Sequence, residues 1–198
     1  MRLPLLLALL LLPACRRDYV QMSRELGTQE VVDPRPPIVE KQHTYYDRDT
    51  ARPRLETTYR IYPGGRKVRH GVEREWYSSG QLHWEREFAD GEPTGRWSSY
   101  YPDGTRESET WPGPDPTPRT TTWWHSNGAV SSTGPSVRGV RHGHWTSYYS
   151  DGALESEGEY VAGRREGQWA FWNQDGSSGA SGIYRAGQRV GDWLRKSE

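Results

Sequence analysis

The acidic residues that recur along the chain are the first candidates for chemistry. Asp103, Asp151 and Asp175 each stand directly before a glycine, at one place in a repeating pattern. Carboxylates at fixed spacing can carry general acid–base catalysis. The same place holds Ser79 and Asn127 in two other copies, however, so the copies share no proton-transferring group. Asp, Asn and Ser before Gly are typical of tight turns, and we expect no catalytic residue and no enzyme activity.

The histidines are the next candidates, because histidine is a common metal ligand. His142 and His144 flank Gly143 and could share one face of an extended strand, and His70 lies in an earlier copy of the motif Val-Arg-His-Gly. The two copies of that motif are 72 residues apart, so these side chains should not converge on one ion. We therefore expect no metal site and no cofactor.

Cys15 is the single cysteine and follows "MRLPLLLALLLLPA". One arginine, an apolar run over 3–12 and the ending Leu-Pro-Ala-Cys resemble the lipobox of bacterial lipoproteins. This resemblance implies a signal peptide over 1–14, a lipid on Cys15 and a place in the bacterial cell envelope, facing the periplasm or exterior. An ordinary cleaved signal is the alternative. A retained membrane span is disfavoured, because it would need about 20 apolar residues.

The elements that position these residues come from an internal repeat of 24 residues. Two sets of positions carry the period. The first set is Gly71, Gly95, Arg119, Gly143, Gly167 and Gly191, and the second is Gly80, Gly104, Gly128, Gly152 and Gly176. Such regularity indicates tandem copies of one structural unit.

Each copy is predicted to form one β-hairpin. An aromatic-rich run such as "HWTSYY" leads to Asp-Gly, Asn-Gly or Ser-Gly, and a second run such as "ALESEGEY" follows. Asp-Gly and Asn-Gly between strand-like runs favour a hairpin, in which Gly supplies a positive φ. The segment "RLETTYRIYPGGRKVRHG" resembles the second half of an earlier copy, with Tyr45 and Tyr46 as the remains of its first strand across a longer turn. The predicted fold is all-β: an elongated, single-layer antiparallel sheet of tandem hairpins.

Composition supports a thin sheet and excludes some partners. Only 32% of the 198 residues are hydrophobic, and 10 Trp and 12 Tyr supply most of the apolar bulk. Such a chain should cover one layer with aromatic rings, because it cannot fill a large aliphatic core. The 26 basic and 26 acidic residues cancel, so no net charge favours nucleic acid.

The predicted domains are the signal peptide over 1–14, a tether over 15–42 and the repeat domain over 43–198. The tether segment "VVDPRPPIVE" carries three prolines and no helical or alternating period. The alternative is an added edge strand, because Val31, Val32, Ile38 and Val39 favour strands.

Aromatic side chains recur on two faces of the predicted sheet. Side chains alternate between the two faces along a strand. One face is predicted to carry one aromatic ring per repeat, which we call the ladder: Trp76, Tyr100, Trp124, Tyr148 and Trp172. The opposite face is predicted to carry Trp97, Trp145, Trp169 and Trp193. Ladder rings in successive hairpins are expected to stack. They either pack along the sheet or stay open to bind a partner.

One copy breaks the pattern. The run "WPGPDPTPR" over 111–119 has four prolines, which cannot donate ladder hydrogen bonds. We expect this segment to bulge outward, and the following run "AVSSTGPS" to be a poor strand. The copy is either a tolerated irregularity or a bend that forms a concave site near Trp111, Trp123 and Trp124.

"YVAGRREGQWAFWNQDG" and "FADGEPTGRWSSYYPDG" resemble MORN repeats, most closely the variant repeats of the YwqK-like antitoxin family. The resemblance covers about residues 45–193. This chain departs from the usual MORN unit by its period of 24 and by tryptophans where many units have glycine. The resemblance implies a hairpin array that binds proteins or lipid, and it brings no catalytic residue.

Two functional classes follow. The first is a membrane-tethered interaction module, antitoxin-like, immunity-like or an envelope scaffold, that binds another protein along the sheet. The second is a carbohydrate or cell-wall binder, because the pattern Trp-x-x-Tyr-Tyr-x-Asp-Gly is similar to choline-binding repeats, whose period is nearer 20 residues. The partner-binding residues predicted for the first class are Trp76, Tyr100, Trp111, Trp123, Trp124, Tyr148 and Trp172.

Overall fold

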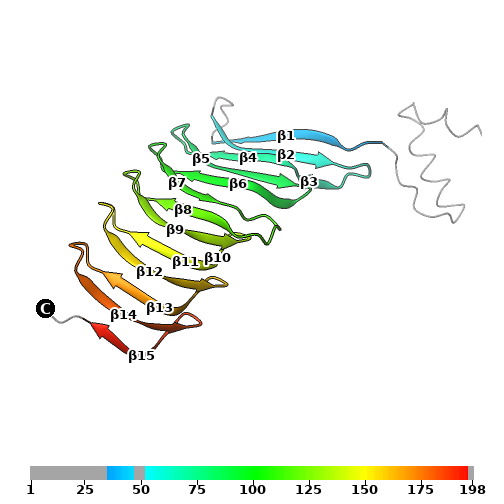
Figure 1. Cartoon of the computed structure of the whole chain (residues 1–198). Coiled ribbons are helices and arrows are strands. Elements are labelled where there is room, and N and C mark those ends of the chain that lie inside the picture. The colour runs from blue at the N-terminus through cyan, green and yellow to red at the C-terminus, as the bar shows by residue number, and fades with distance from the viewer. Residues whose placement is uncertain (1–34, 47–51, 196–198) are drawn as a thin grey trace, which may run out of the picture. The chain divides into compact units, whose positions relative to one another are not determined.

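The computed structural model describes residues 35–46 and 52–195, and every regular element among them is a β-strand (Figure 1). The chain divides into two units, which we describe separately. The larger unit, Ile38–Ile61 with Lys67–Glu198, holds the sheet. In the smaller unit, Tyr62–Arg66 forms a tight turn, in which the Tyr62 amide donates to the Arg66 carbonyl (2.9 Å) and the Arg66 guanidinium lies 3.9 Å from the Tyr62 ring centroid.

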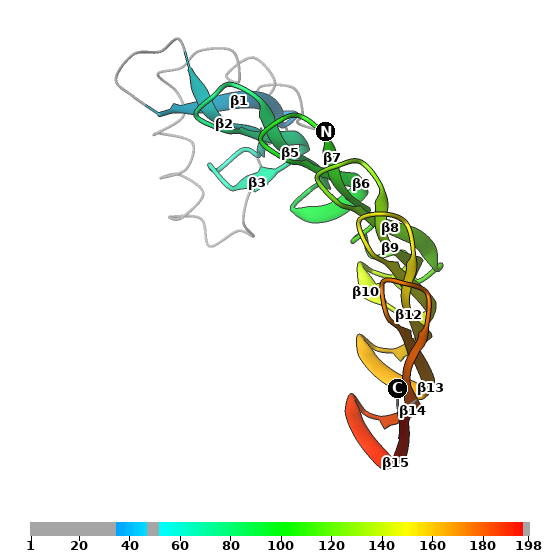
Figure 2. The same ribbon diagram turned by 90° about the vertical axis from the view of Figure 1, so that its left-hand side faces the viewer.

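The strands form one open antiparallel sheet of fifteen strands, and the predicted all-β class of tandem hairpins is confirmed. Thirteen strands follow one another in chain order across it (Figure 2): β1 (Ile38–Tyr45), β2 (Pro53–Ile61), β4 (Gly71–Trp76), β5 (Leu82–Ala89), β6 (Glu92–Tyr100), β7 (Arg106–Thr110), β8 (Arg119–Trp124), β9 (Val130–Val137), β11 (Gly143–Tyr148), β12 (Leu154–Val161), β13 (Arg164–Trp172), β14 (Ser178–Arg185) and β15 (Gln188–Arg195). Two short strands, β3 (Lys67–Arg69) and β10 (Val140–Arg141), pair with β2 and β9.

The turns confirm the role assigned to the Asp-Gly and Asn-Gly pairs. Between β11 and β12 the Gly152 amide donates to the Tyr149 carbonyl (2.9 Å), and Gly152 has a φ of +90°. The Asp151 carboxylate accepts the Ala153 amide at 3.0 Å. A hydrogen bond from the Gln174 side chain, followed by this bond from Ala153, lowers the pKa of Asp151. These carboxylates therefore complete turns. Equivalent side-chain bonds to the amide two residues on are made by Asp103, Asn127 and Asp175.

The repeat domain begins earlier than predicted. Ile38–Tyr45 forms the edge strand β1 and pairs with β2, so the tether predicted over 15–42 is wrong for its last five residues. The alternative of an added edge strand is confirmed at Ile38 and Val39, while Val31 and Val32 lie outside the described residues.

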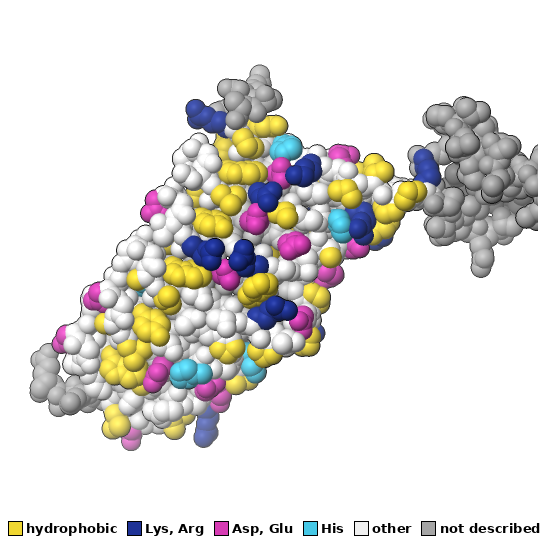
Figure 3. All heavy atoms as spheres, turned by 45° about the horizontal axis from the view of Figure 1, so that its top comes forward, with side chains coloured by type: hydrophobic (Ala, Val, Ile, Leu, Met, Phe, Trp, Pro, Cys, Tyr) yellow, Lys and Arg dark blue, Asp and Glu magenta, His cyan; other side chains and the backbone are white. Residues whose placement is uncertain are grey.

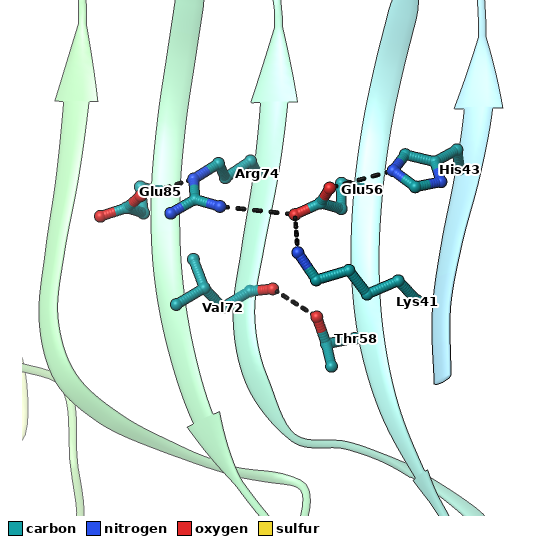
Figure 4. A network of polar contacts seen from close by, with 7 residues as sticks. All are labelled: Lys41, His43, Glu56, Thr58, Val72, Arg74 and Glu85. Carbon is teal, nitrogen blue, oxygen red and sulfur yellow. Dashed lines mark hydrogen bonds and ion pairs between the residues drawn. The ribbon is translucent and has the colours of Figure 1, made fainter. Parts of the chain in front are cut away.

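Polar contacts fasten β1, which is exposed along its whole length (Figure 4). Glu56 on β2 accepts hydrogen bonds from Lys41 (3.3 Å), His43 (2.9 Å) and Arg74 (3.4 Å). Arg74 continues the network to Glu85 on β5 at 2.6 Å. Burial opposes ionisation of Glu56, but the hydrogen bonds from His43 and Lys41 outweigh it and lower the pKa of Glu56.

The proline-rich copy shortens one strand without breaking the sheet. β7 ends at Thr110, and its pairing with β8 is limited to Ser108–Trp123 and Glu109–Thr122. β9, expected to be a poor strand, is complete and pairs with β8 along its length. The Arg138 side chain donates to the Pro114 carbonyl (2.9 Å), which holds the proline segment against the β9–β10 turn.

Tryptophan and glycine alternate in a row that crosses the strands. The register aligns Trp145 with Gly158 and Gly158 with Trp169. A Cβ added at Gly158 would come within 2.4 Å of the Trp169 ring. The same close approach joins Gly134 to Trp145 and Gly182 to Trp193. Each of these rings therefore lies against a strand that has no side chain at that point, which explains the glycine in the apparently weak sequence of β9.

Arginine covers the other side of these rings. The guanidinium carbon of Arg141 lies 4.1 Å from a ring centroid of Trp145, that of Arg165 lies 4.5 Å from Trp169, and that of Arg189 lies 4.2 Å from Trp193. Tyr160 and Tyr184 meet the tryptophans edge to face. Trp145 and Trp169 are only 1% exposed. A single sheet thus buries large rings between glycine and arginine.

Candidate functional site

The predicted aromatic ladder is present, but its members do not stack on one another. Its five side chains are half-buried, and the ring–ring contacts of residues 35–46 and 52–195 join other pairs. Hydrogen bonds connect successive copies instead. Five side chains that follow a ladder strand donate to the backbone carbonyl of the ladder residue in the next copy: Tyr46 to Trp76, Tyr77 to Tyr100 (2.9 Å), Tyr101 to Trp124 (2.7 Å), His125 to Tyr148 (2.8 Å) and Tyr149 to Trp172 (2.9 Å). The expected ring stack is therefore wrong.

The structure does not bring Trp111, Trp123 and Trp124 together in one site. Trp123 and Trp124 are neighbours in β8, so their side chains point to opposite faces of the sheet. Trp111 is half-buried, and the Arg119 guanidinium lies 5.0 Å from its ring centroid. Trp123 is 39% exposed and belongs to a different group of residues.

Trp123 is one of the residues that line a groove of about 340 Å³. The groove lies on the face of the sheet that carries the row of alternating tryptophan and glycine. The register aligns Trp84, Ser99, Ser108 and Trp123 on four adjacent strands. The two serine hydroxyls are 2.7 Å apart and form the floor, while Trp84 and Trp123 stand at its two ends, roughly 14 Å apart at 4.8 Å per strand. Other lining residues include Arg86, Trp97, Glu107 and Thr110. We call this site the tryptophan groove.

Hydrogen bonds and arginine contacts fix the walls of the tryptophan groove. The Trp84 indole donates to the Glu75 carboxylate at 2.6 Å, and the Trp97 indole donates to the Glu87 carbonyl at 3.2 Å. The Arg86 guanidinium carbon lies 4.1 Å from a Trp84 ring centroid and 5.0 Å from Trp97. These two rings are held in place, and such preorganisation lowers the entropy cost of binding.

Glu107 is the acidic residue that lines the groove. Its carboxylate makes no ion pair with any residue in the described part of the chain. Burial raises the pKa of the Tyr77 and Tyr101 phenols, and the negative charge of Glu107 adds to this rise. The register steps from Ser99–Ser108 to Tyr100–Arg106, so Glu107 is the extra residue of a β-bulge. A bulge interrupts the regular alternation of side chains, and Glu107 lines the groove together with Ser108, the register partner of Trp123.

Sequence reasoning missed Trp84, Arg86 and Glu107, although a signal was present. The place of Trp84 is occupied by serine in three later copies, Ser108, Ser132 and Ser156. The place of Trp123 is occupied by Ser99 and Ser147 in its two neighbouring copies. A large aromatic residue that replaces a small polar one on a shared face marks a local departure from the repeat, and a column-by-column comparison of the copies would have found it.

Histidines and cysteine add no further site within the described residues. Over 35–46 and 52–195, no cluster of three or more His, Cys, Asp or Glu side chains could hold a metal ion. His70 lies 3.5 Å from Asp90, and His144 lies 3.5 Å from Glu159 and 3.7 Å from Glu157. Cys15 lies outside the described residues. The described part contains no helix long and apolar enough to cross a membrane.

Comparison with known families supports the repeat assignment. Residues 69–90 and 141–162 match the family model described as MORN repeat variant. Over these two hairpins the chain is similar to MORN-type repeat proteins. Each match begins two residues before a glycine of the first set, at Gly71 or Gly143, and spans one hairpin, β4–β5 or β11–β12. A search of curated proteins finds no match.

Proposed function

We propose that this protein is a non-catalytic interaction module that binds another protein at the tryptophan groove. The observation that carries the proposal is Trp123, a 39% exposed tryptophan at the end of a polar floor, on a face where Trp145 and Trp169 are almost fully buried. Interface hot spots are enriched in Trp and Arg in such pockets. The match to MORN repeat variants supports this class, because MORN repeats are generally modules for protein or membrane interaction.

The distribution of side chains on the face drawn in Figure 3 favours recognition by specific contacts over recognition by net charge. Apolar side chains and charged side chains of both signs are interspersed on it. With no field of one sign, recognition has to come from local shape and individual pairs. The half-buried ladder of Trp76, Tyr100, Trp124, Tyr148 and Trp172 is the second candidate surface, on the opposite face.

We further propose that the module works in the bacterial cell envelope, tethered by a lipid on Cys15. The lipobox-like sequence before Cys15 supports this placement. A role similar to that of YwqK-like antitoxins, or an envelope scaffold, is the finer form of the proposal, and its support is the sequence resemblance alone.

A carbohydrate ligand is the alternative, because the groove also has features that could bind a sugar. Sugar rings stack on tryptophan, and their hydroxyls could bond the Ser99 and Ser108 floor. Peptidoglycan pulldown that depends on Trp123 would favour this class over a protein partner.

Affinity capture from detergent-solubilised envelopes tests the proposed function. The full chain, Trp123→Ser and Ile183→Ser are compared as baits. Serine already stands at the equivalent Ser99 and Ser147, so Trp123→Ser should keep the fold. Ile183 is 45% exposed and lies outside the groove, so its variant controls for lost apolar surface. We expect Trp123→Ser to reduce recovery of the partner by at least about tenfold, with the melting temperature unchanged. Equal recovery by all three baits would contradict the proposal.

A further inference from the structure

We propose that the partner inserts an arginine side chain into the tryptophan groove, where its guanidinium stacks on Trp123 and pairs with the Glu107 carboxylate. This inference rests on the proposed function and specifies the chemistry of the partner.

The first argument is the pattern of arginine caps on this face. Arg141, Arg165 and Arg189 each stand four residues before a tryptophan and lie over its ring. Arg86 lies over both Trp84 and Trp97. Trp123 also lies on this face, and no Lys or Arg in the described part of the chain covers its ring.

The proline-rich segment explains the missing cap. Phe171 occupies the place of Trp123 two copies later, and the Arg165 guanidinium lies 5.4 Å from its ring centroid. The residue equivalent to Arg165 in the proline-rich copy is Thr117. The nearby Arg119 is engaged elsewhere, over Trp111 (5.0 Å) and beside Asp115 (3.4 Å). The groove therefore presents an aromatic ring that could take a cation, and no residue of 35–46 or 52–195 provides one.

The second argument is charge. Glu107 is half-buried and makes no ion pair with the described residues, and a carboxylate in such a place is stabilised by an incoming cation. The Arg86 guanidinium already lies between Trp84 and Trp97, at the other side of the groove. A partner cation is thus favoured at the Glu107 and Trp123 side.

Arginine suits this place better than lysine. A guanidinium is planar, so it can stack flat on an indole while its N–H groups bond a carboxylate edge-on. A lysine ammonium is a compact, strongly hydrated charge and cannot make both contacts with one flat surface. The Ser99 and Ser108 oxygens add acceptors on the groove floor.

A small probe tests this inference without knowledge of the partner. N-acetyl-arginine methylamide is titrated into the full chain in detergent, and the tryptophan indole N–H resonances are followed by nuclear magnetic resonance. The Trp123 resonance is identified by its absence in Trp123→Ser. The neutral analogue N-acetyl-citrulline methylamide has nearly the same shape and serves as the ligand control.

We expect the arginine probe to shift the Trp123 resonance saturably, and the citrulline probe to bind at least about threefold more weakly, since the cation–π contact and the ion pair are both lost. Glu107→Gln should weaken the arginine probe by a similar factor. The matched control is Glu155→Gln, because Glu155 occupies the same place two copies later and lies outside the groove.

Three results would overturn the inference: equal binding of the two probes, no effect of Glu107→Gln, or a Trp123 shift with N-acetylglucosamine and none with the arginine probe. If the arginine probe fails while partner capture still depends on Trp123, the inference is wrong and the protein-binding function stands. If capture does not depend on Trp123, the proposed function itself fails.

Discussion

At the scale of single residues, glycine has two different structural roles in this protein. Gly152 has a φ of +90°, and nothing lies within 4 Å of a Cβ added there, so its duty is conformational. Gly158 has ordinary extended backbone, and its duty is to leave room for Trp169. The proline-rich copy has threonine at both equivalent places, and the Thr110 and Thr121 hydroxyls are 3.1 Å apart. In that copy the hydrogen-bonded pair Thr110–Thr121 stands where a later copy has the packed pair Gly158–Trp169.

This exchange predicts coupling between Gly158 and Trp169. Gly158→Thr should lower the free energy of unfolding by about 1–3 kcal/mol through overpacking, and Trp169→Thr by about 3 kcal/mol or more through the lost ring. The double variant should lose at least about 1 kcal/mol less than the sum, because the clash disappears and a threonine pair can form. The measurement is denaturant unfolding of all four proteins.

The control pair for this cycle is Gly158→Thr with Trp193→Thr, since Trp193 lies over Gly182. These two changes should add to within about 0.5 kcal/mol. Additivity in both cycles would show that glycine and tryptophan are not energetically paired.

At the scale of elements, the edge strand β1 depends on polar contacts. Glu56 is the centre of these contacts, and its pKa is lowered in the folded protein. Because the folded pKa lies below the unfolded value of about 4.3, ionised Glu56 stabilises the docked strand. This contribution is fully present above about pH 4.3 and is lost as the pH falls through the folded pKa.

We therefore expect acid to release β1 before the rest of the sheet. Amide hydrogen exchange of Ile38–Tyr45, corrected for intrinsic rates, should lose protection below about pH 4. Glu56→Gln should reduce protection at pH 6 by about fivefold, equivalent to about 1 kcal/mol for partly exposed pairs. Glu40→Gln is the control, since exposed Glu40 bonds to Gln42 within the same strand. Protection of β1 that is independent of both pH and Glu56 would refute this role.

The sequence predicted some elements well and others poorly, for physical reasons. The turns were predictable, because a positive φ at Gly152 and an acceptor at Asp151 are local requirements. The strand β1 was harder, because its residues are exposed on both faces and show no alternation. The tryptophan groove was only partly predictable. A comparison of the copies marks Trp84 and Trp123 as departures from the repeat, but the register that brings them to one groove comes from the structure.

At the scale of the whole chain, the aromatic core is unevenly distributed. The buried cluster of Trp145, Tyr160, Trp169 and Tyr184 belongs to the later copies. In the earlier copies Phe88 is buried as well, but polar residues such as Thr57, Glu73 and Ser98 take most of the buried places. Later copies therefore supply aromatic packing, while earlier copies leave open the surface on which the tryptophan groove is formed.

The predicted anchor also concerns the whole chain, because it decides where the module works. Cys15→Ser should move the protein from the membrane fraction to the soluble fraction when cells are lysed and fractionated. Two or three acyl chains hold a protein stably, and none remains in this variant. Cys15→Ser that stays with the membrane after washing with high salt would contradict a lipid anchor.

The bonds between copies have a consequence for how such a chain can change length in evolution. The tyrosines that begin three of the turns, Tyr77, Tyr101 and Tyr149, each donate to a backbone carbonyl in the next copy. Three tryptophans, Trp145, Trp169 and Trp193, each lie over a glycine of the preceding hairpin. Duplication of a whole 24-residue unit renews every donor, acceptor, ring and gap together. Loss or gain of a single residue inside a strand leaves all of them mismatched. The gene for such a sheet is therefore free to lengthen only in steps of one repeat, and a segment that departs from the repeat, such as 111–118, is accommodated where it lies between strands.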